Sequence, residues 1–238
     1  MKFNKFINAL NSSACSLAIL IDPDKFNPEL ITLANKSKAV CFLVGGSKLK
    51  SNNISQVVAK IKKLSGLPVI LFPGDETQLT KRADGLLLLS LLSGRNPEYL
   101  INKHIKAAPV IFKLKLAHLP TAYLLIDGGK TSTTQKISKT KPIDPANVNE
   151  IIFTSLAAEQ LGFKAIYLEA GSGAEKTIQP SLIKKIKQKI KLPIIAGGGI
   201  DSEKKASDLI KSGANMIVVG NALEKNINLL SEINKAFK

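Results

Sequence analysis

A carboxylate followed by a glycine-serine-glycine turn is the feature of this sequence that most clearly suggests chemistry. Residues 167–174 read Tyr-Leu-Glu-Ala-Gly-Ser-Gly-Ala and continue a short apolar strand. Glycines allow backbone amides to come close to a bound anion, so this turn is interpreted as a phosphate-binding turn. A carboxylate beside a phosphate is electrostatically unfavourable. We therefore interpret Glu169 as a group that acts on a neutral hydroxyl of a phosphorylated substrate.

Two further glycine turns follow apolar strands in the last third of the chain. One is Gly197-Gly198-Gly199 and the other contains Gly220 and Asn221. A plain tight turn between a strand and a helix would explain any one of them. Three such turns together favour a single convergent phosphate site over that alternative.

A sparse set of oxygen ligands follows the first two predicted strands. Asp22 opens an Asp-Pro-Asp-Lys run, and Ser47 ends a Gly-Gly-Ser run. Magnesium tolerates few protein ligands, because it keeps waters and takes further ligands from substrate phosphates. We therefore predict that Asp22 and Ser47 hold Mg²⁺. Turn chemistry around Pro23 is the alternative for both aspartates, and we assign Asp24 to it because Lys25 can neutralise its charge.

The composition limits the kinds of partner. The 238 residues include 34 Lys and Arg and 18 Asp and Glu, so the formal net charge is +16 at pH 7. This balance permits nucleic acid, an anionic membrane or a polyanionic substrate. The lysines are spread along the whole chain, however, which is typical of a solvated exterior. Aromatic residues make up 5% of the chain and Trp is absent, so we expect no nucleic-acid partner.

The cysteines and the apolar runs bear on location. Cys15 and Cys41 lie in apolar, strand-like runs, which indicates buried free thiols in a reducing compartment. No run of about 18 apolar residues is present. The apolar run 14–21 continues into Asp22 without a small-residue cleavage site. We expect a cytoplasmic protein, and the lysine excess leaves open a peripheral contact with the inner face of an anionic membrane.

Eight apolar segments alternate with helical segments. The expected strands are 16–21, 39–44, 67–72, 85–89, 121–126, 165–168, 192–196 and 216–219. Such alternation predicts a parallel sheet of the α/β class. Eight units in a chain of this length predict a closed (β/α)₈ TIM-type barrel, with an open doubly wound sheet as the alternative. We expect one domain over residues 1–238, with a capping helix at about 1–11.

Some connections are predicted to be irregular. The segment 75–82 is too short for a full crossover helix, so the helix after the third strand is expected to be missing or replaced. A helix is expected from Asn96 to about Ala107, a mobile polar loop over 128–145, and a last helix over about 223–237. In this fold, active sites lie at the carboxyl ends of the strands, where all the motifs above fall.

Taken in order, these motifs resemble the geranylgeranylglyceryl phosphate synthase family, which includes the bacterial heptaprenylglyceryl phosphate synthases. The matching segments are 21–25, 44–47, 93–97, 141–143, 167–174, 196–200 and 218–222. The resemblance covers nearly the whole chain. Its Tyr-Leu-Glu and Gly-Ser-Gly stretch is highly specific, whereas the triple glycine occurs in many phosphate-binding barrels.

The resemblance implies a magnesium-dependent prenyltransferase. Such an enzyme joins sn-glycerol 1-phosphate to a long polyprenyl diphosphate through an ether bond and releases diphosphate. Geranylgeranyl diphosphate is the expected donor. It also implies Mg²⁺ ligation by Asp22 and Ser47, catalytic roles for Glu169 and Tyr167, and a homo-oligomer. The implied glycerol phosphate site is Tyr167, Leu168, Glu169, Ala170, Gly171, Ser172, Gly173, Gly198, Gly199, Gly220 and Asn221.

One position departs from the family. Some bacterial members have a lysine two positions before the metal aspartate, and this chain has Leu20 there. We interpret this as a difference between branches of the family. It leaves the cationic partner of the phosphate unassigned.

Two other functions remain open from the sequence alone. Another phosphate-binding barrel enzyme of small-molecule biosynthesis would lack the metal pair. A non-enzymatic basic protein bound to nucleic acid or membrane would gather its lysines on one face and would not need Glu169.

A prenyltransferase needs a long apolar groove to receive the prenyl tail. We predict such a groove at Leu86–Leu92, left open by the short segment after the third strand.

Overall fold

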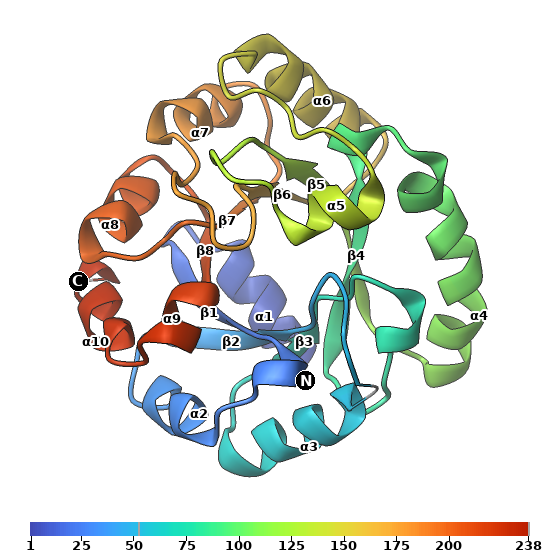
Figure 1. Cartoon of the computed structure of the whole chain (residues 1–238), viewed down its shortest axis with the longest axis vertical. Helices are drawn as coiled ribbons and strands as arrows, with labels where there is room; N and C mark the ends of the chain where they lie inside the picture. Colours follow the sequence, from blue (N-terminus) through green and yellow to red (C-terminus); the bar gives the residue numbers. More distant parts are fainter. Residues whose placement is uncertain (52, 238) are drawn as a thin grey trace.

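Eight parallel strands close into a barrel in which each strand pairs with the next and β8 pairs with β1 (Figure 1). The computed structural model describes residues 1–51 and 53–237. The strands are β1 (Ser16–Ile21), β2 (Ala39–Val44), β3 (Val69–Leu71), β4 (Gly85–Leu91), β5 (His118–Leu125), β6 (Ala165–Glu169), β7 (Ile194–Gly197) and β8 (Met216–Val219). The predicted closed barrel is confirmed. The bounds of β1, β2 and β8 match the prediction, and the other strands differ at one or both ends.

The strands are buried on both faces, which explains their continuous apolar sequences. Alternate residues such as Leu43, Ile70 and Leu87 point inward and form one cluster inside the barrel. Their neighbours, such as Phe42 and Leu71, pack outward against the helices. The main surrounding helices are α2 (Pro28–Ala34), α3 (Ile54–Leu64), α4 (Lys103–Leu114), α6 (Val148–Gln160), α7 (Pro180–Lys187) and α8 (Glu203–Lys211).

Helix α1 (Lys2–Leu10) lies across the amino ends of the strands. Phe6 is fully buried within the inner cluster. The Ser16 hydroxyl at the start of β1 donates to the carbonyl of Ala9 at 3.1 Å. This helix covers the end of the barrel opposite the glycine turns, so the site can open only at the carboxyl end.

The crossover after β3 contains no α-helix, as the sequence predicts. A single 3₁₀ turn, η2 (Glu76–Gln78), takes its place. Gln78 ties this segment to the end of β2: its Nε2 donates to the carbonyl of Gly46 at 2.8 Å, and its Oε1 accepts from the Gly46 amide at 3.3 Å. The short connection leaves an open space along β4, between η2 and α4.

Three of the predicted connections differ from the structure. The loop 128–145 contains a helix, α5 (Thr133–Ser138), which the buried Ser132 caps by accepting from the Gln135 amide at 3.1 Å. Helix α4 follows a π-helical turn, η4 (Glu98–Asn102), and continues seven residues past the predicted end, with Pro109 inside it. The last helix is interrupted, giving α9 (Asn221–Lys225), α10 (Leu229–Asn234) and η5 (Lys235–Phe237).

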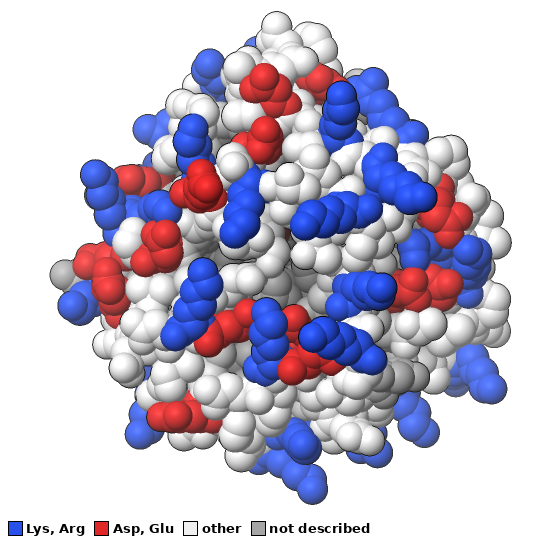
Figure 2. All heavy atoms as spheres, viewed as in Figure 1, with Lys and Arg blue, Asp and Glu red and all other residues white. Residues whose placement is uncertain are grey.

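Charge is widely distributed on the face that carries the carboxyl ends of the strands. Lys and Arg side chains alternate with Asp and Glu around a central hollow (Figure 2). On this face the excess of lysine forms no single basic stripe. Within residues 1–51 and 53–237, no helix has the length and apolar character needed to cross a bilayer.

Candidate active site

A cavity at the carboxyl ends of the strands brings together most of the predicted site residues. The predicted residues on its wall are Asp22, Ser47, Tyr167, Glu169, Ser172, Gly173, Gly198, Gly199, Gly220 and Asn221. They come from the ends of β1, β2, β6, β7 and β8, which are far apart in sequence. The predicted glycine turns therefore converge on one site.

Three predicted residues are not on the cavity wall. Leu168 and Ala170 point outward and pack in the cluster between strands and helices. This follows from the alternation of side chains along a strand, which sends Tyr167 and Glu169 inward. Gly171 contributes through its backbone, because its amide donates a hydrogen bond to the Glu169 carboxylate.

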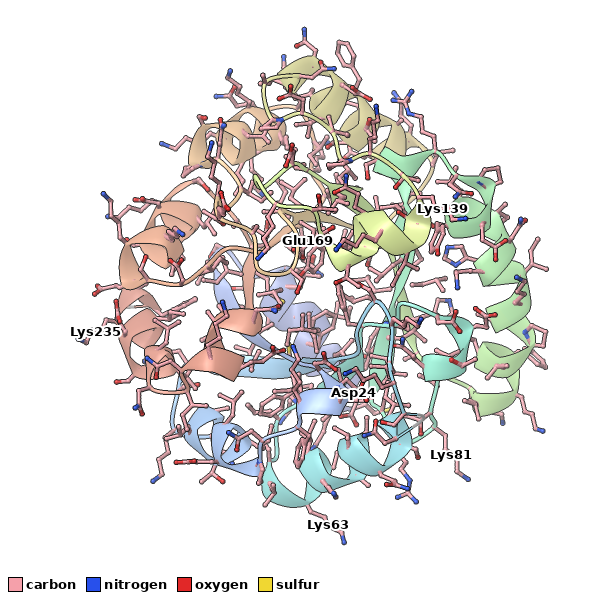
Figure 3. The ribbon with its side chains drawn as sticks, viewed as in Figure 1. Asp24, Lys63, Lys81, Lys139, Glu169 and Lys235 are labelled. Carbon is pink, nitrogen blue, oxygen red and sulfur yellow. The ribbon has the colours of Figure 1, made fainter. Side chains whose placement is uncertain are left out.

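Glu169 is the last residue of β6 and points into the barrel mouth, near the centre of the view in Figure 3. Its Oε1 accepts from the Gly171 amide at 2.7 Å. Burial raises the pKa of Glu169 to about 7, although the Gly171 amide and the Tyr167 hydroxyl nearby act in the opposite direction. A carboxylate with a pKa near neutrality is suited to accepting a proton at physiological pH.

The turn after β7 packs directly on this carboxylate. A Cβ on Gly198 would lie 2.5 Å from Glu169 Oε1 and 2.9 Å from the Gly171 amide nitrogen, and Gly198 has a φ of +85°. A Cβ on Gly197 would collide with the Tyr167 hydroxyl. That hydroxyl is buried and has no hydrogen-bond partner among the described residues. Glycine is therefore required here both for backbone conformation and for space.

We expect Gly198→Ala to displace Glu169 and to weaken binding of a phosphorylated ligand at least about tenfold, with a loss of stability of about 1–3 kcal/mol. Gly162→Ala is the matched control, because Gly162 has the same φ of +85° but open space around its missing Cβ. Thermal unfolding and calorimetric titration with glycerol 1-phosphate measure the two effects. Equal losses of affinity in both variants would show that strain alone, and not contact with Glu169, is responsible.

The turns after β6 and β8 are joined by a side-chain bond. The Ser172 hydroxyl donates to Asn221 Oδ1 at 2.8 Å. Of the helices that follow the three turns, only α9 begins at once, at Asn221. Helices α7 and α8 begin later, at Pro180 and Glu203, so the turns themselves supply most backbone amides near the cavity.

Leu20 also lines the cavity, at the position where some family members have lysine. Three lysines on the same wall offer positive charge instead: Lys25, Lys48 and Lys225. Lys25 is already engaged, because its Nζ is 2.7 Å from Glu224 Oε2.

The predicted Mg²⁺ ligands Asp22 and Ser47 line the same cavity, and carboxylate and hydroxyl oxygens are donors of the kind that Mg²⁺ accepts. Asp22 Oδ1 accepts from the Asp24 amide at 3.0 Å, and Ser47 Oγ lies 3.0 Å from Thr134 Oγ1. Burial raises the pKa of the Asp22 carboxyl, so a cation beside it would be favourable. No group of three or more His, Cys, Asp or Glu side chains suited to a metal occurs in the described part of the chain. Mg²⁺ ligation by Asp22 and Ser47 stays a prediction.

Asp24 has a structural role, but not for the reason expected. Its carboxylate accepts from the Lys50 amide at 2.6 Å and from the Ser51 hydroxyl at 2.8 Å, and so it anchors the loop after β2. Lys25 does not neutralise it. The Lys25 ammonium lies instead between Glu224 and Asp22, 3.9 Å from Asp22 Oδ2.

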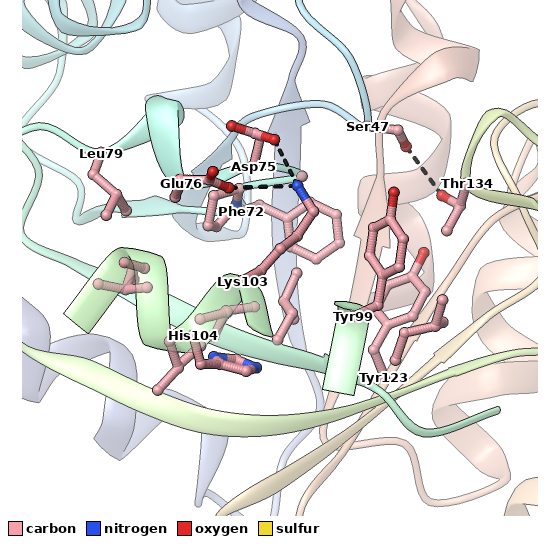
Figure 4. Close-up of a pocket in the computed structure, with 18 of the residues that line it drawn as sticks. Ser47, Phe72, Asp75, Glu76, Leu79, Tyr99, Lys103, His104, Tyr123 and Thr134 are labelled. Carbon is pink, nitrogen blue, oxygen red and sulfur yellow. Dashed lines mark hydrogen bonds and ion pairs between the residues drawn. The ribbon is translucent and has the colours of Figure 1, made fainter. Parts of the chain in front are cut away.

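A second, apolar cavity runs along β4 between α4 and η2 (Figure 4). Leu79, Leu86–Leu89, Leu91, Ala107 and Ile111 line it. It occupies the place left open by the missing crossover helix, where an apolar groove is predicted. Lys103 crosses its rim, with Nζ 2.6 Å from Asp75 Oδ2 and 3.4 Å from Glu76 Oε2.

One polar pair lies within this apolar groove. His104 Nε2 is 2.8 Å from the Ser90 hydroxyl. Burial lowers the pKa of His104, so the imidazole is neutral at physiological pH. His104 therefore adds a neutral polar group to the wall of the groove.

The two cavities meet. Gly46, Ser47, Phe72, Tyr123 and Thr134 line both of them. Phe72, Tyr123 and Thr134 are not among the site residues predicted from the sequence. Tyr123 and Leu125 lie two residues apart on β5, and both face the inside of the barrel. The alternation of side chains along a strand could therefore have placed Tyr123 inside the barrel. Thr134 was missed because α5 was predicted as loop.

The fold and the two connected cavities define a (β/α)₈ barrel with converging glycine turns and a buried carboxylate at the carboxyl ends of its strands. A family model described as the PcrB family matches residues 14–237, and the chain belongs to this family. Geranylgeranylglyceryl phosphate synthase of Chitinophaga pinensis is 43% identical over 236 residues, 97% of this chain and 93% of that protein. The synthase of Methanopyrus kandleri is 36% identical and covers 94% of each chain. The resemblance stated from the motifs is confirmed.

Solved structures agree with this assignment. The crystal structure of (S)-3-O-geranylgeranylglyceryl phosphate synthase from Thermoplasma acidophilum, in complex with substrate sn-glycerol-1-phosphate, has a TM-score of 0.91 to this chain at 28% identity. It covers 100% of this chain and 97% of its own. Thiamine phosphate pyrophosphorylase from Pyrococcus furiosus has a TM-score of 0.60 at 17% identity over 96% of this chain and 97% of its own, and it shares the fold alone.

Proposed function

We propose that the protein is a prenyltransferase that joins sn-glycerol 1-phosphate to a long polyprenyl diphosphate through an ether bond. The observation that carries this proposal is the junction of a glycine-turn cavity, with Glu169 on its wall, and an apolar groove. A barrel enzyme acting on two small polar substrates would have no use for the groove. The family relatives, named geranylgeranylglyceryl phosphate synthase, support the same reaction.

In this proposal the glycine turns hold the phosphate of glycerol 1-phosphate. Backbone amides after β6, β7 and β8 face the anion, and Ser172 and Asn221 fix two of the turns relative to each other. The Thermoplasma acidophilum enzyme, whose structure contains sn-glycerol-1-phosphate, has the same barrel over the whole chain. Anchoring the phosphate places the hydroxyl at the other end of the glycerol beside Glu169.

The reaction forms one bond at C1 of the prenyl chain and breaks one there, with transfer of the hydroxyl proton. The glycerol oxygen bonds to C1 of the prenyl chain, the bond from C1 to the diphosphate breaks, and diphosphate leaves. Glu169 accepts the hydroxyl proton, and the apolar groove along β4 holds the tail. Asp22 and Ser47 would hold Mg²⁺, which supplies positive charge to the departing diphosphate.

Incubation of the purified protein with radiolabelled glycerol 1-phosphate and prenyl diphosphates of several lengths tests the proposal. Label should pass into organic solvent only when both substrates and Mg²⁺ are present, and geranylgeranyl diphosphate is the expected best donor. Glycerol 3-phosphate is the control acceptor. The absence of any extractable product with every donor would contradict the proposed function.

The pKa of Glu169 predicts the pH dependence of this reaction. A general base must be deprotonated, so kcat should fall about tenfold per unit below pH 7 and level off above it. Measuring kcat at saturating glycerol 1-phosphate separates this from ionisation of the free substrate, whose second phosphate pKa is about 6. A kcat that stays constant down to pH 5.5 would rule out Glu169 as the base.

We also propose a membrane contact through the outer face of α4 and η4. Ile101, Ile105 and Phe112 share this face, and Phe112 is 85% exposed. Lys106 and Lys113 are exposed beside them, and the inner face of α4 lines the groove for the tail. Apolar side chains flanked by lysines on the helix beside that groove suit docking on an anionic bilayer that supplies the prenyl substrate.

Sedimentation with phosphatidylglycerol vesicles should therefore fall severalfold in Phe112→Ser. It should stay unchanged in Phe153→Ser, which alters an exposed aromatic residue on α6. Unchanged vesicle binding together with a smaller mass in light scattering would show instead that this face joins copies of the chain into the expected homo-oligomer.

A further inference from the structure

Three aromatic side chains form a cluster where the two cavities meet. Phe72 follows the end of β3, Tyr123 lies on β5 and Tyr167 lies on β6. The rings of Tyr123 and Tyr167 are stacked, with centroids 5.3 Å apart and an angle of 18°. The Phe72 centroid is 5.1 Å from that of Tyr167 and 6.2 Å from that of Tyr123. Figure 4 shows Phe72 and Tyr123 on the wall of the apolar groove.

In the proposed reaction, these rings lie where the new bond would form. If the acceptor binds in the cavity of the glycine turns and the prenyl tail in the apolar groove, as proposed above, their reacting atoms meet at the junction of the two. Phe72 and Tyr123 line both cavities, whereas Tyr167 is fully buried and lines only the acceptor cavity. Tyr167 therefore backs the other two rings, and Phe72 and Tyr123 are the aromatic surface at the reacting carbon.

We infer that the rings of Phe72 and Tyr123 stabilise the positive charge that develops on C1 of the prenyl group as its bond to diphosphate breaks. This inference rests on the proposed prenyl transfer. Loss of diphosphate from an allylic carbon leaves a carbon with partial positive charge, and the face of an aromatic ring carries negative potential that attracts a cation. Stabilisation of charge that appears only in the transition state raises kcat and leaves substrate binding unchanged.

The surroundings of the rings support this role. None of the residues that line both cavities carries a formal charge: they are Gly46, Ser47, Phe72, Tyr123 and Thr134. Among the described residues, no ammonium group of the junction wall therefore opposes a carbocation, and the charge of a Mg²⁺ held by Ser47 would be offset by the departing diphosphate. Burial raises the pKa of Tyr123 and of Tyr167 well above the ordinary value, with the Glu169 charge acting in the same direction. Both phenols stay neutral, so neither presents a phenolate that would capture the cation.

Fluorination of the Phe72 ring tests the inference with little change of shape. Each added fluorine weakens the negative potential of the ring face, so full-length protein is made with phenylalanine, 4-fluoro-, 3,5-difluoro- and 3,4,5-trifluorophenylalanine at position 72. The logarithm of the single-turnover rate should fall steadily along this series, by about threefold to thirtyfold in total. The affinity for glycerol 1-phosphate should stay constant. The same series at Phe6, which is buried at the other end of the barrel, should be flat.

Tyr123 gives a second measurement. Tyr123→Phe keeps the ring and should retain kcat within about threefold, whereas Tyr123→Leu should lose at least about tenfold in kcat with little change in KM. A rate that is independent of fluorine number at position 72 overturns the inference, provided that the unsubstituted protein is active. If the unsubstituted protein makes no ether product with any donor, the proposed function fails and the inference falls with it.

Discussion

Glu169→Gln should lower the rate of ether formation by about 10²–10⁴-fold, the range usual for loss of a general base. Glutamine has nearly the shape of glutamate and can still accept the bond from the Gly171 amide, but it cannot take the hydroxyl proton. The affinity for glycerol 1-phosphate should change little, because the turns that hold the phosphate are intact. Single-turnover rates and calorimetric titration separate the two effects.

The stability of the same variant provides an independent test. Because the pKa of Glu169 is raised to about 7 in the folded protein, the native state favours the protonated form more than the unfolded chain does. Its contribution to stability is present below the unfolded pKa of about 4.5 and is lost as pH rises through 7. At pH 8 the folded wild type must bury an ionised carboxylate, and Glu169→Gln removes that cost. The free energy of unfolding of the variant at pH 8 should therefore be about 1–3 kcal/mol higher than that of the wild type.

Glu175→Gln is the matched control. Glu175 is exposed, lies in the same connection after β6 and is not on the cavity wall, so neither rate nor stability should change. A Glu169→Gln variant that keeps full activity would remove Glu169 from the chemistry. If the variant were inactive and also less stable than the wild type at pH 8, the loss of activity would come from damaged folding and not from loss of the base.

Asp22→Asn should reduce activity by about 10²–10³-fold and weaken metal binding, because it removes the only carboxylate of the proposed Mg²⁺ site. Ser47→Ala should have a smaller effect of the same kind. Water-proton relaxation with Mn²⁺ as the probe measures metal binding without relying on turnover. The concentration of Mg²⁺ for half-maximal activity should rise in both variants.

Asp144→Asn is the control for this prediction. Asp144 makes a similar turn bond, in which its Oδ1 accepts from the Ala146 amide at 2.8 Å, but it lies away from the cavity. Unchanged Mn²⁺ binding in Asp22→Asn, or wild-type activity in excess EDTA, would contradict the metal assignment.

The parts of the site that could be predicted from sequence are those fixed by local pattern. Glu169 ends an apolar strand and precedes two glycines, and in a parallel barrel this position must be at the rim. The same argument places Asp22, Ser47 and Gly198 there. Each prediction depends only on where a strand ends, and strand ends are well marked in this chain by turn residues.

The residues that escaped prediction depend on packing between distant segments. Thr134 reaches Ser47 because α5 folds over the barrel mouth, and nothing local in a polar loop shows where it will dock. Lys25 was paired with its sequence neighbour Asp24, but the 3₁₀ turn after β1 directs it towards Glu224, 199 positions away. The aromatic cluster requires the closed barrel, since its members come from β5, β6 and the end of β3.

A crystal structure with bound sn-glycerol 1-phosphate tests the central claim most directly. The account predicts the phosphate among the backbone amides of the turns after β6, β7 and β8, with a hydroxyl oxygen of the glycerol within hydrogen-bond distance of Glu169. A phosphate bound away from those turns, or a glycerol whose hydroxyls all point away from Glu169, would contradict it.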